Sequence, residues 1–129
     1  MKSGQVRKRI LIVDDAATVR LYHRGILESS GYCVEEALNG IEALEKILES
    51  SFDLLLVDIN MPKLDGFGFL KELRRQEMPQ PPAIMVSTEA AAHDEMAAYR
   101  AGANCYLLKP VRPVQLMAHV RVLLGEANQ

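Results

Sequence analysis

The sequence has few of the features that would direct a chain to a membrane, to nucleic acid or to a disulfide scaffold. Its longest wholly apolar run is four residues, far below the roughly 20 that a membrane-spanning helix needs. Acidic and basic residues nearly balance at 17 and 15, so no net field attracts nucleic acid or a membrane surface. Aromatic residues make up only 5% of the chain and offer little surface for stacking bases. With 49% hydrophobic residues, the composition is that of a soluble globular protein.

Cysteine is scarce as well. Cys33 and Cys105 lie far apart in strand-like segments, and we expect two buried free thiols in a reducing cytoplasm rather than a disulfide. The first residues, 1–9, contain no apolar stretch of the kind found in secretion signals. A cytoplasmic location is therefore expected. The length of 129 residues predicts one domain, residues 1–129.

Short apolar segments alternate with amphipathic ones along the chain. The continuous run Ile10–Val13 is typical of a strand covered on both faces, whereas the partly polar Tyr32–Ala37 predicts an edge strand. The remaining strands are expected at Phe52–Val57, Ala83–Val86 and Cys105–Leu108, and the helices at Thr18–Glu28, Ile41–Glu49, Phe67–Arg75, Ala91–Ala101 and from Pro113 onward. This alternation predicts an α/β fold, a five-stranded parallel sheet with helices on both faces.

Apolar spacing within the helices predicts which side chains face the sheet. The expected inward residues are Val19, Tyr22, Ile26 and Leu27 in the first helix, Ile41, Leu44, Ile47 and Leu48 in the second, and Leu116, Met117, Val120, Leu123 and Leu124 in the last. His23, His93 and His119 share no metal-ligand spacing, so each is expected to be a solvated helix residue.

Polar side chains follow four of the apolar strand-like runs. Asp14 and Asp15 come after the first run, Asp58 after the third, Ser87 after the fourth and Lys109 after the fifth. The carboxyl ends of parallel strands open onto one crevice, where ligands bind in open α/β sheets. We therefore expect three carboxylates, a hydroxyl and an ammonium to meet in one small site.

The three carboxylates predict a metal ion. Carboxylates within ~4–6 Å repel one another unless a cation neutralises them. Their all-oxygen ligand set favours Mg²⁺, with Mn²⁺ as an alternative, over zinc. A carboxylate beside a bound metal is also suited to accept a phosphoryl group, as in covalent catalysis through an aspartyl phosphate.

Longer motifs carry a resemblance to a known family. They are Ile-Val-Asp-Asp at 12–15, Leu-Val-Asp-Ile-Asn-Met-Pro-Lys-Leu-Asp-Gly at 56–66, Val-Ser-Thr-Glu-Ala at 86–90, Ala-Gly-Ala-Asn-Cys-Tyr at 101–106 and Leu-Lys-Pro at 108–110. In these, the chain resembles the receiver domain of bacterial two-component response regulators, especially stand-alone chemotaxis regulators of the CheY-like type. The resemblance runs from about Arg9 to Leu124. It implies a flavodoxin-like sheet of strand order 2-1-3-4-5.

The resemblance also implies a role for each site residue. Asp58 is the expected phosphoacceptor. The metal ligands are expected to be the Asp15 and Asp58 side chains and the Asn60 backbone carbonyl, with Asp14 acting through water. Ser87 and Lys109 would contact the phosphoryl oxygens, and Ser87 and Tyr106 would form the switch. The lifetime of the phosphoryl group is expected to depend on Asn60, Thr88 and Glu89. At three positions, Ala16, Thr88 and Val111, the chain departs from the commonest family pattern, which affects rates and partner choice rather than the reaction.

A sensor histidine kinase is the implied phosphodonor. Because only residues 125–129 follow the last expected helix, we expect output by protein–protein contact, without DNA or membrane binding. The expected partner is a flagellar motor component or a histidine phosphotransferase, contacted through helix 91–101, strand 105–108 and helix 113–124. Ala92, Glu95, Tyr99 and His119 would form a mixed patch on this face of a monomer.

Two other classes of function compete with this interpretation. A magnesium-dependent phosphatase of the haloacid-dehalogenase type needs a second Asp two residues after its nucleophile, where this chain has Asn60. A flavin-binding protein needs a phosphate-binding loop after the first strand, where Asp14 and Asp15 would repel a phosphate. Turnover of external phosphate esters would favour the first alternative, and flavin absorbance the second.

Overall fold

A computed structural model describes residues 7–88 and 92–126. One parallel sheet has the strand order β2-β1-β3-β4-β5, as the sequence resemblance implied. Its strands are β1 (Arg9–Val13), β2 (Cys33–Ala37), β3 (Leu54–Asp58), β4 (Ala83–Ser87) and β5 (Cys105–Leu108). The helices are α1 (Ala17–Ser29), α2 (Gly40–Glu49), α3 (Gly66–Arg74), α4 (Ala92–Ala101) and α5 (Pro113–Leu123). The fold is therefore the expected α/β sheet in the flavodoxin-like order.

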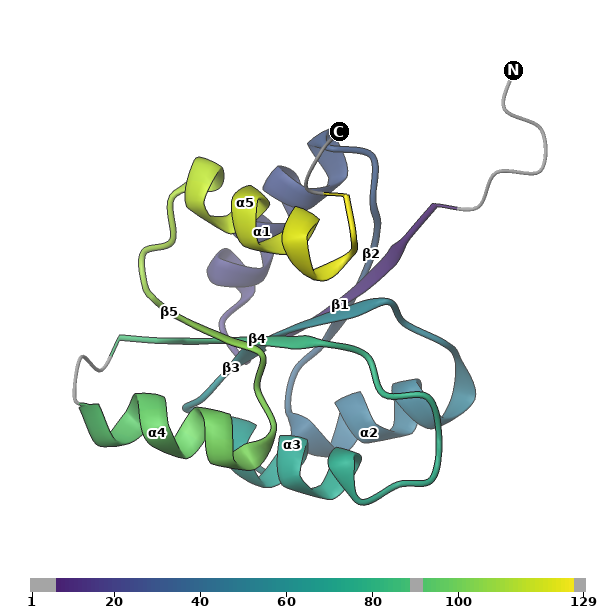
Figure 1. Ribbon diagram of the computed structural model, residues 1–129, viewed down its shortest axis with the longest axis vertical. Coiled ribbons are helices and arrows are strands. Elements are labelled where there is room, and N and C mark those ends of the chain that lie inside the picture. The colour runs from purple at the N-terminus through teal and green to yellow at the C-terminus, as the bar shows by residue number, and fades with distance from the viewer. Residues whose placement is uncertain (1–6, 89–91, 127–129) are drawn as a thin grey trace.

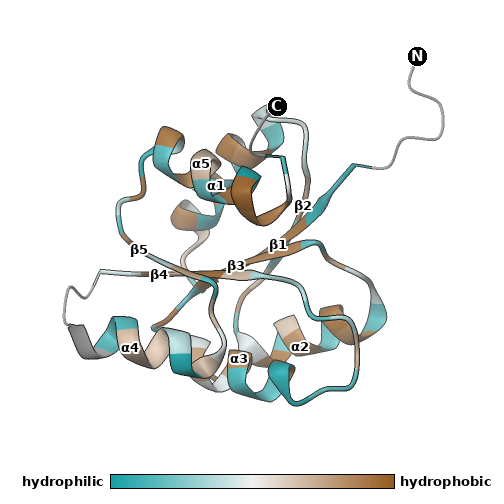
Figure 2. Ribbon diagram, in the orientation of Figure 1, coloured by the Kyte–Doolittle hydropathy of each residue, from teal (hydrophilic) through white to brown (hydrophobic). Residues whose placement is uncertain are grey.

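The helices cover both faces of the sheet, α1 and α5 on one side and α2, α3 and α4 on the other (Figure 1). Side chains alternate across each strand, so Ile10 and Ile12 pack in one core layer and Leu11 and Val13 in the other. The strands at the centre of Figure 2 are correspondingly apolar. All five residues of β3 are buried, whereas β2 is partly exposed at the edge, as its polar sequence predicted.

Local sequence explains where several elements begin. The Asn39 side chain accepts a hydrogen bond from the Glu42 amide and caps α2, and Asp65 caps α3 by accepting from the Gly68 amide. Pro113 begins α5, at a position where a helix has no use for an amide donor. β3 and β4 continue one residue further than expected, through Asp58 and Ser87. Both residues therefore belong to the sheet itself.

The expected helix faces were only partly right. In α5, Leu116, Met117 and Val120 are buried, as predicted. In α2, by contrast, Ile41 and Leu48 are 48% and 62% exposed, and in α1 Tyr22 is 45% exposed. A helix contacts a sheet along a narrow line. When the apolar stripe of the helix is wider than this line, the residues at the sides of the stripe remain in solvent. In α2 that line is formed by small and branched residues, namely Gly40, Ala43 and Ile47.

Two further predictions of burial, outside the expected apolar helix faces, were also wrong. His23, expected in solvent, is 2% exposed because it lies on the inner face of α1 with Leu27. Cys33, expected to be buried, is exposed at the start of edge strand β2, whereas Cys105 is buried. Both thiols are free, as predicted. His119 is partly buried, and the side chain of His93 lies outside the described residues. Within the described part of the chain, no helix is long and apolar enough to cross a membrane.

Candidate functional site

The strand register brings the predicted site residues to one edge of the sheet. Val13 pairs with Val57, so Asp14 and Asp58 follow side by side at the ends of β1 and β3. Ser87 pairs with Leu108, so Lys109 follows directly at the end of β5. Residues separated by up to 95 positions in sequence thus meet across three strands.

The backbone amide, the backbone carbonyl and both carboxylate oxygens of Asp14 all form hydrogen bonds. Its amide donates to the Ala37 carbonyl at 3.1 Å, and its own carbonyl accepts from the Arg20 guanidinium at 2.8 Å. One carboxylate oxygen accepts from the Ala16 amide at 2.9 Å, and the other from the Lys109 ammonium at 3.2 Å. The side chain is 2% exposed. Asp14 therefore has a single orientation fixed by its neighbours.

Asp58 is the buried carboxylate at the centre of the site. It is 5% exposed, and its Oδ1 accepts from Lys109 Nζ at 2.8 Å. Burial raises the pKa of Asp58 above its usual value, and the negative charge of Asp14 raises it further. The hydrogen bond from Lys109 lowers the pKa and partly offsets this increase. For Lys109, burial alone would lower the pKa, but the hydrogen bond to Asp58 and the charge of Asp14 raise it above its usual value. Lys109 is accordingly a fixed cation between two buried anions.

The three aspartates lie close enough together to hold a divalent cation. Asp14, Asp15 and Asp58 each offer a carboxylate oxygen, and these oxygens lie within 4.8 Å of one another. Three carboxylates and the single Lys109 ammonium leave two negative charges unbalanced, which matches the charge of one divalent ion. Asp15 is exposed, so its carboxylate can reach an ion from the solvent side. The oxygen-only ligand set suits Mg²⁺. The donors present therefore fit such an ion.

The loop after β3 packs tightly against the site. Gly66 donates its amide to the Ile59 carbonyl at 2.9 Å, and a Cβ at Gly66 would lie 2.5 Å from the Asp58 carbonyl oxygen. Only glycine allows this close approach of the loop to the strand end. Asn60 lies in the same loop and is exposed. Asn60 is thus open to solvent two residues after Asp58.

Of the remaining predicted residues, Ser87 and Thr88 lie at the end of β4 and Tyr106 lies within β5. Ser87 is completely buried at the end of β4, and Thr88 follows it at the surface. Thr88 and Lys109 line a pocket of about 440 Å³ that continues over α1. Tyr106 is half-buried and packs against the core layer under α3 and α4. Glu89 lies outside the described residues.

A model of the response regulator receiver domain matches residues 10–121. The chain belongs to this family. Over 121 residues, this receiver domain is 36% identical to the transcriptional regulatory protein ResD of Bacillus subtilis, covering 94% of the chain but 50% of ResD. It therefore spans about half the length of that relative.

Solved structures of similar size also match the receiver domain. The Vibrio cholerae chemotaxis protein CheY4 is 33% identical with a TM-score of 0.86, covering 92% of this chain and 100% of that one. The receiver domain of the sensor histidine kinase PA1611 from Pseudomonas aeruginosa, with a magnesium ion coordinated in its active-site cleft, is 30% identical with a TM-score of 0.86. It covers 93% of this chain and 99% of its own.

Sequence reasoning missed two residues of the receiver domain that lie close to this site, both on α1. Arg20 bonds to the Asp14 backbone, and buried His23 lines the same pocket as Thr88 and Lys109. The signal for Arg20 was a basic residue in the second turn of the helix that follows the acidic pair. For His23, it was a spacing of four residues from Leu27, which places both on one helix face.

Proposed function

We propose that Asp58 accepts a phosphoryl group from the phosphohistidine of a sensor histidine kinase. The observation that carries this proposal is the geometry of Asp58, a buried carboxylate paired with Lys109 at 2.8 Å and flanked by two further aspartates. One Asp58 oxygen forms the new bond to phosphorus while the phosphorus–nitrogen bond breaks and its electron pair returns to the imidazole. Bound Mg²⁺, held by Asp15, Asp58 and the Asn60 carbonyl, would neutralise phosphoryl charge.

Lys109 and Ser87 are the residues that respond to the new charge. The Lys109 ammonium already touches Asp58 and can follow a phosphoryl oxygen on the same carboxylate. The Ser87 hydroxyl is positioned at the end of the adjacent strand, because Asp58 pairs with Val86. Movement of Ser87 toward the phosphoryl group would leave space for the half-buried Tyr106 ring. Phosphorylation thereby changes the outer face next to β5.

Covalent labelling tests the acceptor directly. Incubation with acetyl phosphate and Mg²⁺ should add one phosphoryl group, detected by intact-mass spectrometry. Asp58→Asn should not be labelled at an equivalent rate. Asp53→Asn is the matched control. Asp53 comes just before β3, at the end of the strand opposite to Asp58, and its carboxylate accepts a hydrogen bond from the Arg9 amide. Equal labelling of wild type and Asp58→Asn would refute the acceptor assignment.

We propose a switch with self-catalysed phosphoryl transfer and autodephosphorylation rather than an enzyme for external substrates. The position two residues after Asp58 carries Asn60, whose amide cannot act as the general acid of an aspartyl-phosphate phosphatase. Incubation with p-nitrophenyl phosphate and Mg²⁺ tests this. We expect no release of p-nitrophenol above the background of Asp58→Asn, and sustained turnover would support the phosphatase alternative.

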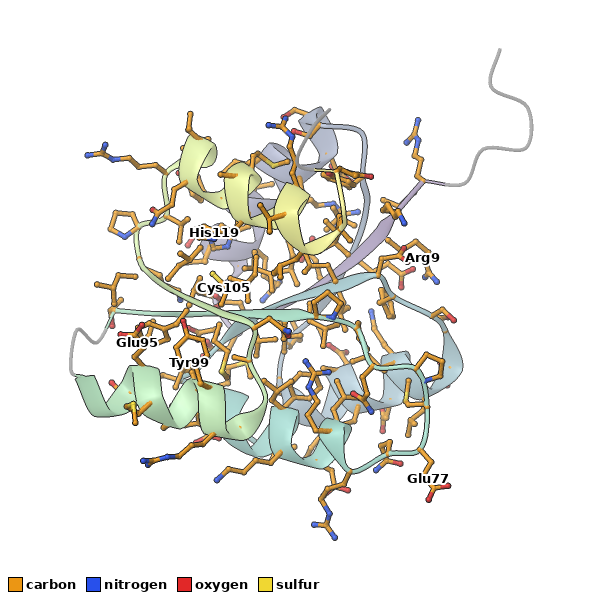
Figure 3. The ribbon with its side chains drawn as sticks, in the orientation of Figure 1. Arg9, Glu77, Glu95, Tyr99, Cys105 and His119 are labelled. Atoms are coloured by element: carbon orange, nitrogen blue, oxygen red, sulfur yellow. The ribbon has the colours of Figure 1, made fainter. Side chains whose placement is uncertain are left out.

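Output is proposed to use the face made by α4, β5 and α5. Glu95 and Tyr99 on α4 lie on one side of the sheet edge and His119 on α5 lies on the other, with Cys105 of β5 between them (Figure 3). Tyr99 is 45% and Leu108 44% exposed, which gives this face modest apolar area. The side chain of Ala92, expected in this patch, lies outside the described residues. A helix or tail of a protein partner would suit such a mixed surface.

Chemotaxis is the proposed setting, with a cytoplasmic monomer as the acting form. The match that covers 100% of a Vibrio cholerae chemotaxis protein supports it. A relay to a histidine phosphotransferase is the competing outcome. Affinity capture with the beryllofluoride-bound form, presented with flagellar motor and phosphotransferase components, separates the two. Light scattering with and without beryllofluoride tests the monomer, and a doubled mass would contradict it.

A further inference from the structure

Arg20 connects the acidic loop to the edge strand of the sheet. Its guanidinium donates to the Asp14 carbonyl at 2.8 Å through one nitrogen and to a Glu36 carboxylate oxygen at 2.7 Å through another. The Arg20 side chain is 12% exposed, and Glu36 is 27% exposed. Glu36 is itself held on its other oxygen by Arg24 at 2.5 Å. The charge-assisted hydrogen bond from Arg20 to Glu36 therefore ties the guanidinium that contacts the loop to β2.

The carbonyl that Arg20 contacts belongs to the peptide between Asp14 and Asp15. Because a peptide unit is planar, the direction of this carbonyl also sets the plane from which the Asp15 residue departs. Asp14 is fixed by its own side-chain bonds, but Asp15 is exposed and projects from the surface of the cluster. The orientation of the Asp15 carboxylate thus depends on the peptide plane that Arg20 holds.

We propose that Arg20, clamped by Glu36, is a positioning residue for the metal site, orienting Asp15 through the Asp14–Asp15 peptide. This inference rests on the proposed magnesium-dependent function. Arg20 contacts no carboxylate of the cluster in the described structure, so its effect on a bound cation is carried by the backbone. Residues that orient metal ligands from behind typically change metal affinity by 10–100-fold when replaced.

Charge and geometry predict opposite results for Arg20→Met. Removing a positive charge near the cluster would strengthen cation binding if electrostatics alone mattered. If Arg20 positions the peptide, its loss should weaken Mg²⁺ binding by about tenfold. Arg20→Lys separates the two further, because lysine keeps the charge but lacks the planar fork that reaches Glu36 and the carbonyl together. We expect Arg20→Lys to bind Mg²⁺ more weakly than wild type.

Arg24→Met is the matched control. This change also removes one positive charge from α1, and it also removes an arginine that binds Glu36. The other bonds of Arg24 go to Glu28 and the Val34 carbonyl rather than to Asp14. Its Mg²⁺ affinity should equal or slightly exceed that of wild type. Arg24→Met thus measures the effect of lost charge and of a loosened Glu36 without loss of the peptide contact.

The experiment is a Mg²⁺ titration of each variant of the 129-residue chain, followed by amide chemical shifts, with melting curves recorded without metal. Weaker binding by Arg20→Met and Arg20→Lys, with Arg24→Met unchanged, supports the positioning role. Wild-type or tighter affinity in Arg20→Met would overturn it. If Arg20→Met does not fold, Arg20→Lys decides the question alone, since wild-type affinity there would overturn the role. Absence of Mg²⁺ binding by wild type would instead reject the magnesium site itself and this inference with it.

Discussion

Lys109 lies between two buried carboxylates, 2.8 Å from Asp58 and 3.2 Å from Asp14, and is the cation that both share. Its ammonium can follow charge added to Asp58 without leaving Asp14. The Lys109 side chain is 17% exposed, so its contacts are largely shielded from solvent. This pair of contacts makes Lys109 the natural connection between the acceptor and the end of β5.

Replacement of Lys109 should separate phosphorylation from signalling. Lys109→Ala should still accept phosphate from acetyl phosphate, but its phosphorylated form should bind the output partner about tenfold more weakly, because the charge that couples the phosphoryl group to β5 is gone. Lys71→Ala, an exposed lysine on α3, is the control. Wild-type partner affinity in phosphorylated Lys109→Ala would contradict this coupling.

Magnesium should stabilise the folded domain. At ~10 times its dissociation constant, Mg²⁺ should add about 1.4 kcal/mol to the free energy of unfolding, because the carboxylates converge only in the folded state. Asp15→Asn should abolish this gain while the fold persists, since the change also relieves repulsion. Thermal melting with and without Mg²⁺ measures it, with exposed Glu45→Gln as control. Equal shifts in Asp15→Asn and wild type would argue against the metal ligands.

Thr88 should prolong the phosphorylated state by crowding the approach of water. Thr88→Ala should therefore speed the decay of the phosphoryl group on Asp58 after the donor is removed. Thr18→Ala is a matched control, because Thr18 lines the same pocket from α1 and does not follow β4. Decay rates are measured by intact mass over time, and an unchanged rate in Thr88→Ala would exclude this role.

Tyr106 should couple Asp58 to the output face. Tyr106→Ala should weaken partner binding by about 1–2 kcal/mol while Asp58 still accepts phosphate, because the ring that fills the space left by Ser87 is absent. In wild type, beryllofluoride should shift the Tyr106 ring signals in NMR spectra. Tyr32 packs in the opposite core layer and serves as the unshifted reference. Unshifted Tyr106 signals would leave it as a packing residue only.

His23 should make the fold sensitive to mild acid. Burial lowers the pKa of His23, Lys109 lowers it further, and Asp14 only partly opposes them. The unfolded chain therefore binds a proton near pH 6.5 that the folded chain does not, so stability should fall as pH drops below 6.5 toward the lowered pKa. The Nδ1 atom of His23 is buried without a hydrogen-bond partner.

His23→Leu should flatten this part of the stability curve and raise stability by about 1 kcal/mol at pH 7, because it removes an unsatisfied buried nitrogen. Urea unfolding between pH 5.5 and 7.5 measures both effects. An unchanged slope in His23→Leu would assign the pH dependence to other groups. His119→Leu is the control, because His119 is only partly buried and its replacement should change the pH dependence of stability less.

The sequence alone indicated the sheet, its edge strand and the residues of the site. Apolar runs bounded by polar residues mark strand ends, and the polar residues Asp58 and Lys109 stand at such ends regardless of how the chain packs. The order of the strands came from the family resemblance carried by the motifs around them. Because parallel strands share one carboxyl edge, the convergence of these residues followed from local patterns.

The tertiary structure decided which side chains are covered and what holds the site residues in place. Successive residues of a helix point about 100° apart. Tyr22 is exposed and His23 buried because the packing of α1 selects the helix face that carries His23 and Leu27. Arg20, which bonds to the Asp14 carbonyl, also bonds to Glu36, 16 residues away on β2. Local periodicity fixes which residues share a face, whereas contacts of this kind exist only once strands and helices are packed together.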